Sequence, residues 1–267
     1  MAHVNRALTI EVEGLRKVFV QTSTGEPVVA IEQLGFRIER GEMVAIVGQT
    51  GCGKSTFLNL LIGLDRPTAG RITIGGETPY DDFDHFRGVL AAVFQQDRLL
   101  PWRTALDNVC LPLELLGRDR RDHETRARAW LERLGLAGFE GAYPHELSGG
   151  MRQRVALARA FVIEPALLLA DEAFGHLDEV TAAALRQTFV QLARSEGNTA
   201  VLVTHQLEEA IEIGGRILVF GRPGRLLADI DLAHWGSSDA PRLRTIIQRM
   251  LQTNAPDPEI GATKEAS

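Results

Sequence analysis

Residues 48 to 55 read G-Q-T-G-C-G-K-S, and they follow directly on the apolar run M-V-A-I-V at residues 43 to 47. The apolar run predicts a strand that is buried on both faces. The segment after the glycines, T-F-L-N-L-L-I at residues 56 to 62, predicts a helix. A strand, a glycine-rich loop and a helix in this order are typical of a loop that binds phosphate groups.

The residue types in this loop match the needs of a polyphosphate. Gly48, Gly51 and Gly53 allow backbone N–H groups to approach the phosphates without side chains in the way. We expect Lys54 to reach the β- and γ-phosphates and the Ser55 hydroxyl to bind Mg²⁺. The alternative is a glycine-rich turn without a ligand. The residues expected to bind the nucleotide here are Gly48, Gln49, Thr50, Gly51, Cys52, Gly53, Lys54, Ser55 and Thr56.

Composition narrows the class of protein. The chain has 267 residues, 45% of them hydrophobic, with a net charge of -6. Its apolar stretches are too short to cross a bilayer, and residues 1–6 have no apolar core of a signal peptide, so we expect a cytoplasmic location. The arginines of residues 118–133 alternate with acidic residues, which favours a solvated helix face over a nucleic-acid surface. Two cysteines predict neither a disulfide framework nor a metal cluster.

The pattern along the chain predicts an α/β fold. Extended segments at residues 8–12 and 36–39 predict an antiparallel sheet ahead of the loop strand, and residues 97–163 predict a helical lobe. Strand and helix signals alternate again from residue 166, which indicates a parallel core that the lobe interrupts. We therefore expect one nucleotide-binding domain over residues 7–235, followed by a helix and a flexible tail over residues 236–267.

A second anion-facing helix start is predicted at residues 147 to 154, which read L-S-G-G-M-R-Q-R. Ser148 adds a hydroxyl donor to the N–H groups of Gly149 and Gly150. A chain with one phosphate loop does not need a second phosphate-binding segment of its own. We therefore expect this segment to close over the nucleotide of a partner chain in a symmetric dimer. The alternative is a helix-capping turn.

Two further segments predict groups for hydrolysis. The apolar run at residues 167–170 ends in Asp171 and Glu172, which places two carboxylates at the carboxyl edge of a parallel sheet. We expect Asp171 to hold Mg²⁺ through water and Glu172 to orient and deprotonate the attacking water. His205, after the apolar run at 200–203, is expected to contact the γ-phosphate; its alternative is a structural histidine.

In these motifs the chain resembles the ATPase subunits of ABC transporters over nearly its whole length. Residues 147–154 resemble the signature motif, 167–172 Walker B, and 175–178 the D-loop. The resemblance identifies Gln95 as the Q-loop glutamine and His205 as the switch histidine. It implies that Gln95 senses Mg²⁺ and the γ-phosphate, that Asp178 lies at the nucleotide, and that Phe19 stacks on adenine. A core position for Phe19 is the alternative. The catalytic residues implied are Glu172, His205, Lys54 and Gln95.

A finer resemblance is to importers of nitrate, sulfonate and taurine. It rests on F-Q-Q-D-R-L-L-P-W at residues 94–102 and on residues 143–154. It implies an ATPase that dimerises on ATP, with an identical partner, and drives a separate permease fed by a solute-binding protein. The chain would lie on the inner face of the membrane. The alternatives are an ABC-type ATPase without a permease, or a nucleotide-regulated binding module with little turnover.

Three residues carry separate expectations. Cys52 lies beside a helix amino terminus, which predicts a lowered thiol pKa and reactivity that ATP would block; the alternative is a buried, inert thiol. Ala173 replaces the proline that usually follows the family's glutamate, which leaves the backbone of Glu172 less restricted. His176 replaces the small residue that is usual in the D-loop. An imidazole that titrates there would make dimer closure depend on pH, and the alternative is that the change is neutral.

Overall fold

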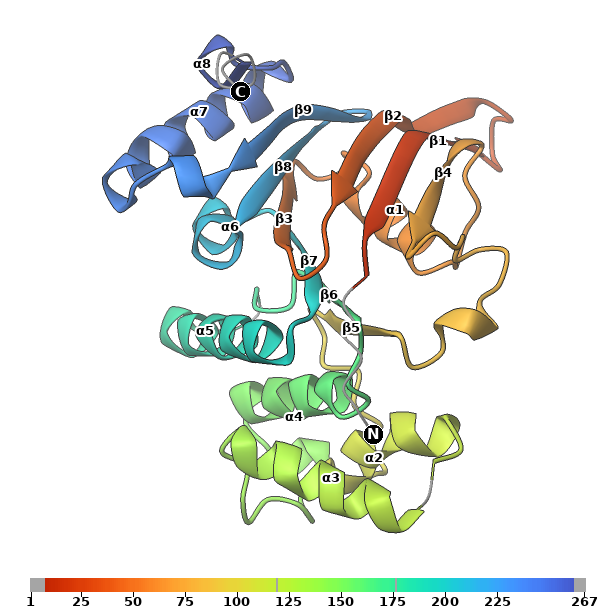
Figure 1. Cartoon of the computed structure of the whole chain (residues 1–267), viewed down its shortest axis with the longest axis vertical. Helices are drawn as coiled ribbons and strands as arrows, with labels where there is room; N and C mark the ends of the chain where they lie inside the picture. The colour runs from red at the N-terminus through yellow and green to blue at the C-terminus, as the bar shows by residue number, and fades with distance from the viewer. Residues whose placement is uncertain (1–7, 119, 176, 262–267) are drawn as a thin grey trace. The chain divides into compact units, whose positions relative to one another are not determined.

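The computed structural model describes residues 8–118, 120–175 and 177–261. Its chain divides into two compact units (Figure 1). Residues 8–85 and 199–261 form the unit that carries the phosphate loop, here the loop unit. Residues 86–198 form the second, here the helical unit. The helical unit extends beyond the lobe expected at 97–163, because two strands and a further helix belong to it.

The loop unit is built on a sheet with the strand order β4-β1-β2-β9-β8-β3-β7. β1 pairs antiparallel with β2 and β4, whereas β3 pairs parallel with β7 and β8. The predicted combination of an antiparallel part and a parallel part is therefore confirmed. The strands are β1 (Ile10–Val20), β2 (Pro27–Ile38), β3 (Met43–Gly48), β4 (Ala69–Ile74), β7 (Thr199–Thr204), β8 (Arg216–Gly221) and β9 (Gly224–Asp231).

Aromatic packing fixes the first helix of the loop unit against its sheet. Phe57 lies 5.6 Å from Phe36 of β2 and 5.8 Å from Phe220 of β8 between ring centroids. Phe57 and Phe220 are fully buried, so this contact holds the helix that follows the phosphate loop. The helices of this unit are α1 (Lys54–Leu61), α6 (Leu207–Ile213), α7 (Ala240–Thr253) and α8 (Pro258–Gly261).

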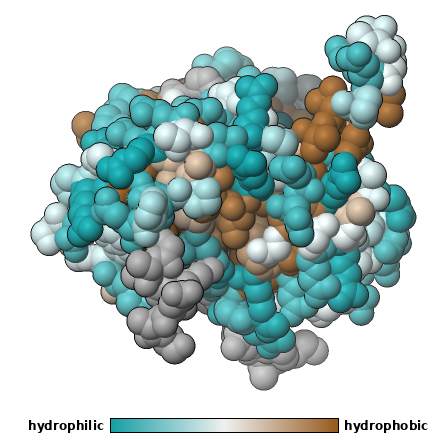
Figure 2. Space-filling view, turned by 90° about the horizontal axis from the view of Figure 1, so that it is seen from above, coloured by the Kyte–Doolittle hydropathy of each residue, from teal (hydrophilic) through white to brown (hydrophobic). Residues whose placement is uncertain are grey.

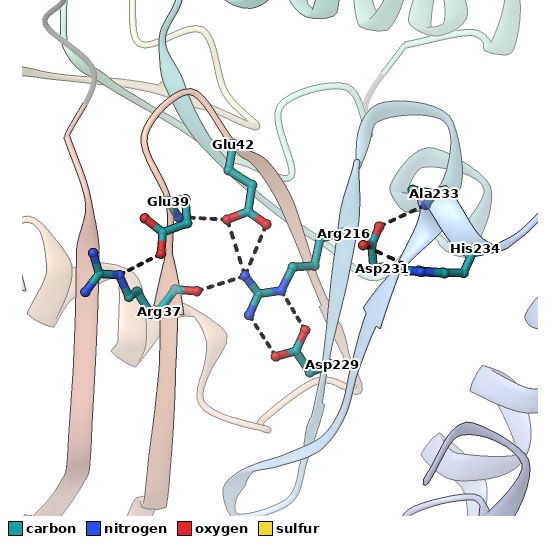
Figure 3. Close-up of polar contacts among 8 residues, drawn as sticks. All are labelled: Arg37, Glu39, Glu42, Arg216, Asp229, Asp231, Ala233 and His234. Atoms are coloured by element: carbon teal, nitrogen blue, oxygen red, sulfur yellow. Dashed lines mark hydrogen bonds and ion pairs between the residues drawn. The ribbon is translucent and has the colours of Figure 1, made fainter. Parts of the chain in front are cut away.

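An arginine cluster ties four segments of the loop unit together at the start of β8 (Figure 3). Arg216 binds both carboxylate oxygens of Asp229 on β9, at 2.6 and 2.7 Å. It also donates to Glu42 at 3.1 Å and to the carbonyl of Arg37 at 2.8 Å. Hydrogen bonding to Asp229 raises the pKa of Arg216 above its ordinary value. The cluster joins β2, β8, β9 and the turn before β3.

The helical unit combines a parallel strand pair with a group of α-helices. β5 (Leu90–Phe94) pairs with β6 (Leu167–Asp171), and α2 (Ala105–Leu115), α3 (Arg120–Arg133) and α4 (Gly149–Phe161) contact one another. α5 (Glu179–Glu196) contacts α4. Trp130 stacks on Phe161 at 5.3 Å, and Phe161 meets Phe189 of α5 at 6.2 Å. The helices predicted in this part of the chain are confirmed.

The carboxyl-terminal helix predicted after residue 236 is confirmed as α7, whose apolar side is buried through Leu243, Ile246, Ile247 and Met250. Residues 258–261, which the sequence predicts as part of the flexible tail, form α8, and the carboxylate of Asp257 is 3.1 Å from Arg249. Asp257 is only 5% exposed, so an ion pair and burial hold this segment. Residues 262–267 lie outside the described part of the chain.

Two observations on the described residues concern the hydrophobicity of the helices and of the surface. Within the described residues, no helix combines the length and the apolar character needed to cross a membrane. Hydrophilic residues cover most of the face shown in Figure 2, and hydrophobic residues gather in limited areas of it.

Candidate functional site

The phosphate loop requires glycine at three positions of the loop unit. Gly51 and Gly53 have φ angles of 79° and 91°, in the region that L side chains rarely adopt. A Cβ at Gly53 would lie 2.6 Å from the carbonyl oxygen of Ala30 on β2. At Gly48 a Cβ would lie 2.8 Å from the carbonyl oxygen of Phe220 and would collide with the sulfur of Cys52. Backbone geometry and close packing both explain the predicted pattern.

The start of α1 presents backbone donors and a lysine. Its N-cap is Gly53, which provides no side-chain cap, so no side chain competes for the first N–H groups through capping. Lys54 is 7% exposed, and its Nζ donates to the carbonyl oxygens of Gly48 at 2.6 Å and Gln49 at 3.2 Å. The ammonium is therefore held at the loop, where an anion at the helix start would meet its charge. Ser55 is exposed in the same turn.

The expectation of a reactive Cys52 with a lowered pKa is wrong. Cys52 is 1% exposed, and burial raises the pKa of its thiol above the ordinary value. The charge of Lys54, whose Nζ is 3.9 Å from the sulfur, acts in the opposite direction but does not offset the loss of water. The alternative, a buried thiol, is what the structure contains. The position of Cys52 in the sequence, close to the start of a helix, does not indicate that its side chain is buried.

The loop and His205 leave the sheet at the same edge of the loop unit. β3 and β7 run parallel with Val47 opposite Thr204, and the loop and His205 follow these two residues. Carboxyl ends of parallel strands are where open α/β folds bind ligands. The Thr204 hydroxyl accepts from the N–H of Gln206 at 3.0 Å and also bonds to the buried carboxyl group of Glu209. These bonds fix the turn that carries the exposed His205.

Phe19 is a surface residue of the loop unit. Its residue is 41% exposed, so the core alternative is excluded. The ring lies 4.8 Å from Nζ of Lys17, which also forms an ion pair of 2.6 Å with Asp65. Phe19 pairs with Val28 of β2. Ala30 follows two residues later on the same strand, and its carbonyl oxygen is the atom closest to a Cβ placed on Gly53. An aromatic face near the phosphate loop is compatible with stacking on a base.

In the helical unit, the Q-loop and the acidic pair share one strand edge. β5 and β6 run parallel with Phe94 opposite Asp171, so Gln95 and Glu172 each follow one of these partners. Glu172 has a φ of 47°, an uncommon value for a residue with a side chain and a form of strain that concentrates at functional sites. Gln95, Asp171 and Glu172 are all partly exposed. This arrangement brings an amide and two carboxyl groups to one edge.

The signature segment has a local structural role in this unit. The Ser148 hydroxyl caps α4 by accepting from the N–H of Met151 at 3.3 Å. A Cβ at Gly150 would lie 2.8 Å from Cγ2 of Thr181 on α5, whereas one at Gly149 would meet only ordinary contacts. The helix-capping turn, which was the alternative for this segment, is therefore present. Close packing against Thr181 explains the glycine at position 150 but not the one at position 149. A role at the nucleotide of a partner remains a prediction.

Asp178 also caps a helix. Its side chain accepts from the N–H of Thr181 at 3.0 Å at the start of α5. This hydrogen bond is the main reason that the pKa of Asp178 lies below its ordinary value. The contact of Asp178 with nucleotide stays a prediction.

Gln153 is a residue of the site that sequence reasoning missed, although it lies within the signature segment. Its side chain is buried, and Nε2 donates to the carbonyl oxygens of Phe94 at 3.1 Å and Ala173 at 2.6 Å. These carbonyls flank Gln95 and Glu172 in the chain. Both acceptors are far from Gln153 in the sequence, so no local sequence pattern indicates these hydrogen bonds. A cavity of 450 Å³ adjoins it and is lined by Gln95, Gln96, Asp97, Arg98, Gly149, Arg152, Gln153, Ala173 and Leu177.

The two departures from the family pattern have different outcomes. Ala173 is 2% exposed, and its carbonyl is one of the acceptors of Gln153. A proline there would favour an extended Glu172, whereas Glu172 has a φ of 47°, so alanine suits the observed backbone. His176 lies outside the described residues.

A parallel strand edge with a phosphate loop, a second edge with an acidic pair, and a capped glycine-rich helix are typical of a P-loop nucleoside triphosphatase of the α/β class. Comparison with known proteins gives the family. Residues 31–175 match the ABC transporter family model. The chain therefore belongs to the ABC transporter family and is an ATPase subunit of that family.

Curated relatives match over most of the chain. It is 44% identical to the taurine import ATP-binding protein TauB of Rhizobium johnstonii, over 80% of this chain and 81% of the relative. It is 38% identical to the aliphatic sulfonates import ATP-binding protein SsuB of Pseudomonas putida, over 95% and 91%. A solved dimeric bacterial ABC transporter cassette matches with a TM-score of 0.74 and 34% identity, over 84% of this chain and 98% of that one. The predicted α/β cassette fold is confirmed.

Proposed function

We propose that this chain is the ATP-hydrolysing subunit of an importer for a sulfonate, with taurine or an aliphatic sulfonate as the solute. The observation that carries the proposal is the 44% identity to a taurine import subunit over 80% of the chain. Relatives with 36% and 38% identity are named for aliphatic sulfonates. These names support the sulfonate class, and nitrate, which the sequence motifs also allowed, has no such support among these relatives.

The chemistry of hydrolysis is assigned to residues of both units. Glu172 orients the attacking water and accepts its proton, a contribution that is typically worth ~10²–10⁴ in rate. Lys54 offsets charge on the phosphate oxygens, and His205 contacts the γ-phosphate. Gln95 reports the state of the γ-phosphate to the helical unit. The support is that each residue lies at the carboxyl edge of a parallel strand pair in its own unit.

The donor set fits Mg²⁺ as the cofactor. In the described part of the chain, no three His, Cys, Asp or Glu side chains gather into a possible metal site. Mg²⁺ usually keeps several waters and binds through substrate phosphates with one or two protein oxygens, so a full cage is not needed. Ser55, Gln95 and Asp171 would hold it with ATP. When bound, the ion neutralises charge on the β- and γ-phosphates.

Two partners complete the proposal. A second copy of this chain would place its Ser148, Gly149 and Gly150 on the nucleotide of the first copy. The support is a pair of dimeric cassette structures of similar fold, one described as a post-hydrolysis state with ADP and phosphate. A separate permease, supplied by a solute-binding protein, would provide the membrane path. The chain would then be peripheral on the inner face of the membrane.

The test is transport by the assembled complex. The chain is purified in complex with its permease, and the complex is placed in proteoliposomes together with the solute-binding protein. Uptake of labelled taurine, ethanesulfonate and nitrate is measured together with ATP hydrolysis. We expect ATP-dependent uptake of a sulfonate and no uptake of nitrate, with both uptake and hydrolysis lost in a Glu172→Gln complex. Active hydrolysis without sulfonate uptake would overturn the solute assignment, and hydrolysis unaffected by Glu172→Gln would overturn the base.

A further inference from the structure

A second cation lies against the phosphate loop. The turn between β8 and β9 carries Arg222, and a Cβ placed on Gly51 would lie 3.6 Å from Cζ and 3.7 Å from Nε and Nη2 of its guanidinium. Gly51 is part of the phosphate loop and has a φ of 79°. Arg222 is exposed, so its guanidinium meets both the loop and solvent. No motif in the sequence singled out this arginine.

The carboxyl-terminal helix holds this turn in place. Asn254, the C-cap of α7, accepts from the backbone N–H of Arg222 at 2.7 Å and donates to its carbonyl oxygen at 2.6 Å. The carbonyl of Asn254 accepts from Arg225 at 2.6 Å. A Cβ at Gly221 would lie 2.7 Å from Oδ1 of Asn254, so the close approach depends on glycine. Both backbone polar groups of Arg222 are thus engaged by one side chain.

The same helix also contacts the loop directly. Nε2 of Gln49 donates to the carbonyl oxygen of Leu251 in the last turn of α7, at 2.9 Å. α7 itself is anchored by a buried apolar side and contacts β8. The helix therefore has two connections to the phosphate site, one through Gln49 and one through the turn that carries Arg222.

We propose that Arg222 is a second cationic ligand of the ATP phosphates, and that α7 positions it through Asn254. The proposal rests on the proposed binding of ATP at this loop. A guanidinium is always charged and presents a planar set of donors that suits phosphate oxygens. Lys54 already directs its ammonium to the loop carbonyls of Gly48 and Gln49, so a second cation would add charge from a different side chain.

The test compares nucleotide affinity among variants of the full chain. Binding of Mg²⁺-ATP and of adenosine is measured by calorimetry for the parent, Arg222→Ala, Arg222→Lys and Asn254→Ala, at low and at physiological salt. Arg40→Ala is the matched control, because it removes an exposed arginine from the turn before β3, at the opposite end of that strand. Circular dichroism and thermal unfolding confirm that each variant folds.

We expect Arg222→Ala to weaken ATP binding about tenfold at physiological salt, the effect of losing one charge-assisted contact. Arg222→Lys should recover part of this loss, and Asn254→Ala should weaken ATP binding several-fold. Adenosine affinity should stay unchanged, and Arg40→Ala should match the parent. Parental ATP affinity in Arg222→Ala, or equal losses for ATP and adenosine, would overturn the proposal. A parent chain that does not bind ATP would instead overturn the proposed function.

Discussion

At the residue scale, unusual backbone conformations position the proposed general base and shape the phosphate loop. Glu172 has a φ of 47°, and the phosphate loop depends on positive φ at Gly51 and Gly53. A residue with a side chain keeps such a conformation only where surrounding contacts enforce it, whereas glycine adopts it readily. For Glu172 these contacts include the bond from Gln153 to the next residue's carbonyl. The carboxyl group of Glu172, the proposed general base, is therefore positioned by a backbone conformation that a residue with a side chain does not favour.

Replacement of Glu172 by glutamine tests the general base. The substitution keeps the size of the side chain and removes its ability to accept a proton. We expect ATP hydrolysis to fall by about 10²-fold or more, with ATP affinity kept within about threefold. Steady-state ATPase rates and calorimetric binding measure the two effects. Glu132→Gln, an exposed change on α3, is the control, and near-parental turnover in Glu172→Gln would reject the assignment.

The thiol of Cys52 should resist modification in the folded protein. Burial raises its pKa, so the reactive thiolate is scarcer at pH 8 than in a free cysteine, and the sulfur is also shielded. Burial also raises the pKa of Cys110, to about 11. We expect maleimide to label both cysteines at least ~10-fold more slowly than in urea-unfolded chain. Mass spectrometry of timed samples measures this, and rapid labelling of Cys52 that ATP prevents would contradict it.

At the element scale, α4 contacts the segments on both sides of the strand edge that carries Gln95 and Glu172. Gln153 bonds to the carbonyls of Phe94 and Ala173, and Arg159 of the same helix donates to the carbonyls of Asp97 and Arg98 at 2.6 and 2.8 Å. The signature segment begins this helix. A movement of α4 would therefore shift the segments that carry Gln95 and Glu172.

Gln153→Met tests this link, because methionine keeps the length of the side chain but lacks the amide donor. Buried carbonyls that lose a donor cost about 1–3 kcal/mol of stability. We expect that loss in denaturant unfolding, and a fall in kcat that exceeds any rise in KM for ATP, since Gln153 acts through the positions of its neighbours. Gln191→Met on the exposed side of α5 is the control. A change in stability with kcat intact would leave Gln153 with a structural role alone.

Arg216 should be the most consequential surface arginine for the sheet of the loop unit. Its side chain is 19% exposed and contacts Asp229, Glu42 and a β2 carbonyl, so Arg216→Met leaves two partly buried carboxylates without their partner. We expect a loss of about 1–3 kcal/mol in the free energy of unfolding. Arg71→Met, which breaks the exposed pair with Glu13, should cost less than about 1 kcal/mol. Equal losses in the two variants would contradict the ranking.

At the scale of the whole molecule, the groups proposed for catalysis belong to two different compact units. The loop unit carries Lys54 and His205, and the helical unit carries Gln95 and Glu172. Each set is held at the edge of its own parallel strand pair. The proposed mechanism thus assigns roles in hydrolysis to residues of both units.

Binding of ATP should stabilise the folded chain by an amount that rises with the logarithm of the ATP concentration divided by Kd. At an ATP concentration 100 times Kd, linkage predicts ~2.7 kcal/mol of stabilisation, which corresponds to a rise of about 5 °C or more in Tm. Lys54→Met should abolish most of this increment, even if its starting Tm is lower, and Arg40→Met should keep it. Differential scanning fluorimetry measures the increment. A full ATP-dependent shift in Lys54→Met would show that the lysine does not hold phosphate.

The sequence by itself determined the class of fold, the phosphate loop and the family. These features depend on short spacings, such as glycines within one loop or carboxylates at the end of one apolar run, and local chemistry fixes what such spacings can form. Only the tertiary structure decided the burial of Cys52, the packing of Gly150 on Thr181, and the hydrogen bonds of Gln153. It also decided the contact of Arg222 with the phosphate loop and the helix α8 at residues 258–261. Each of these depends on residues that come together across the fold, and no pattern of neighbours along the chain records which distant carbonyl or side chain a residue will meet.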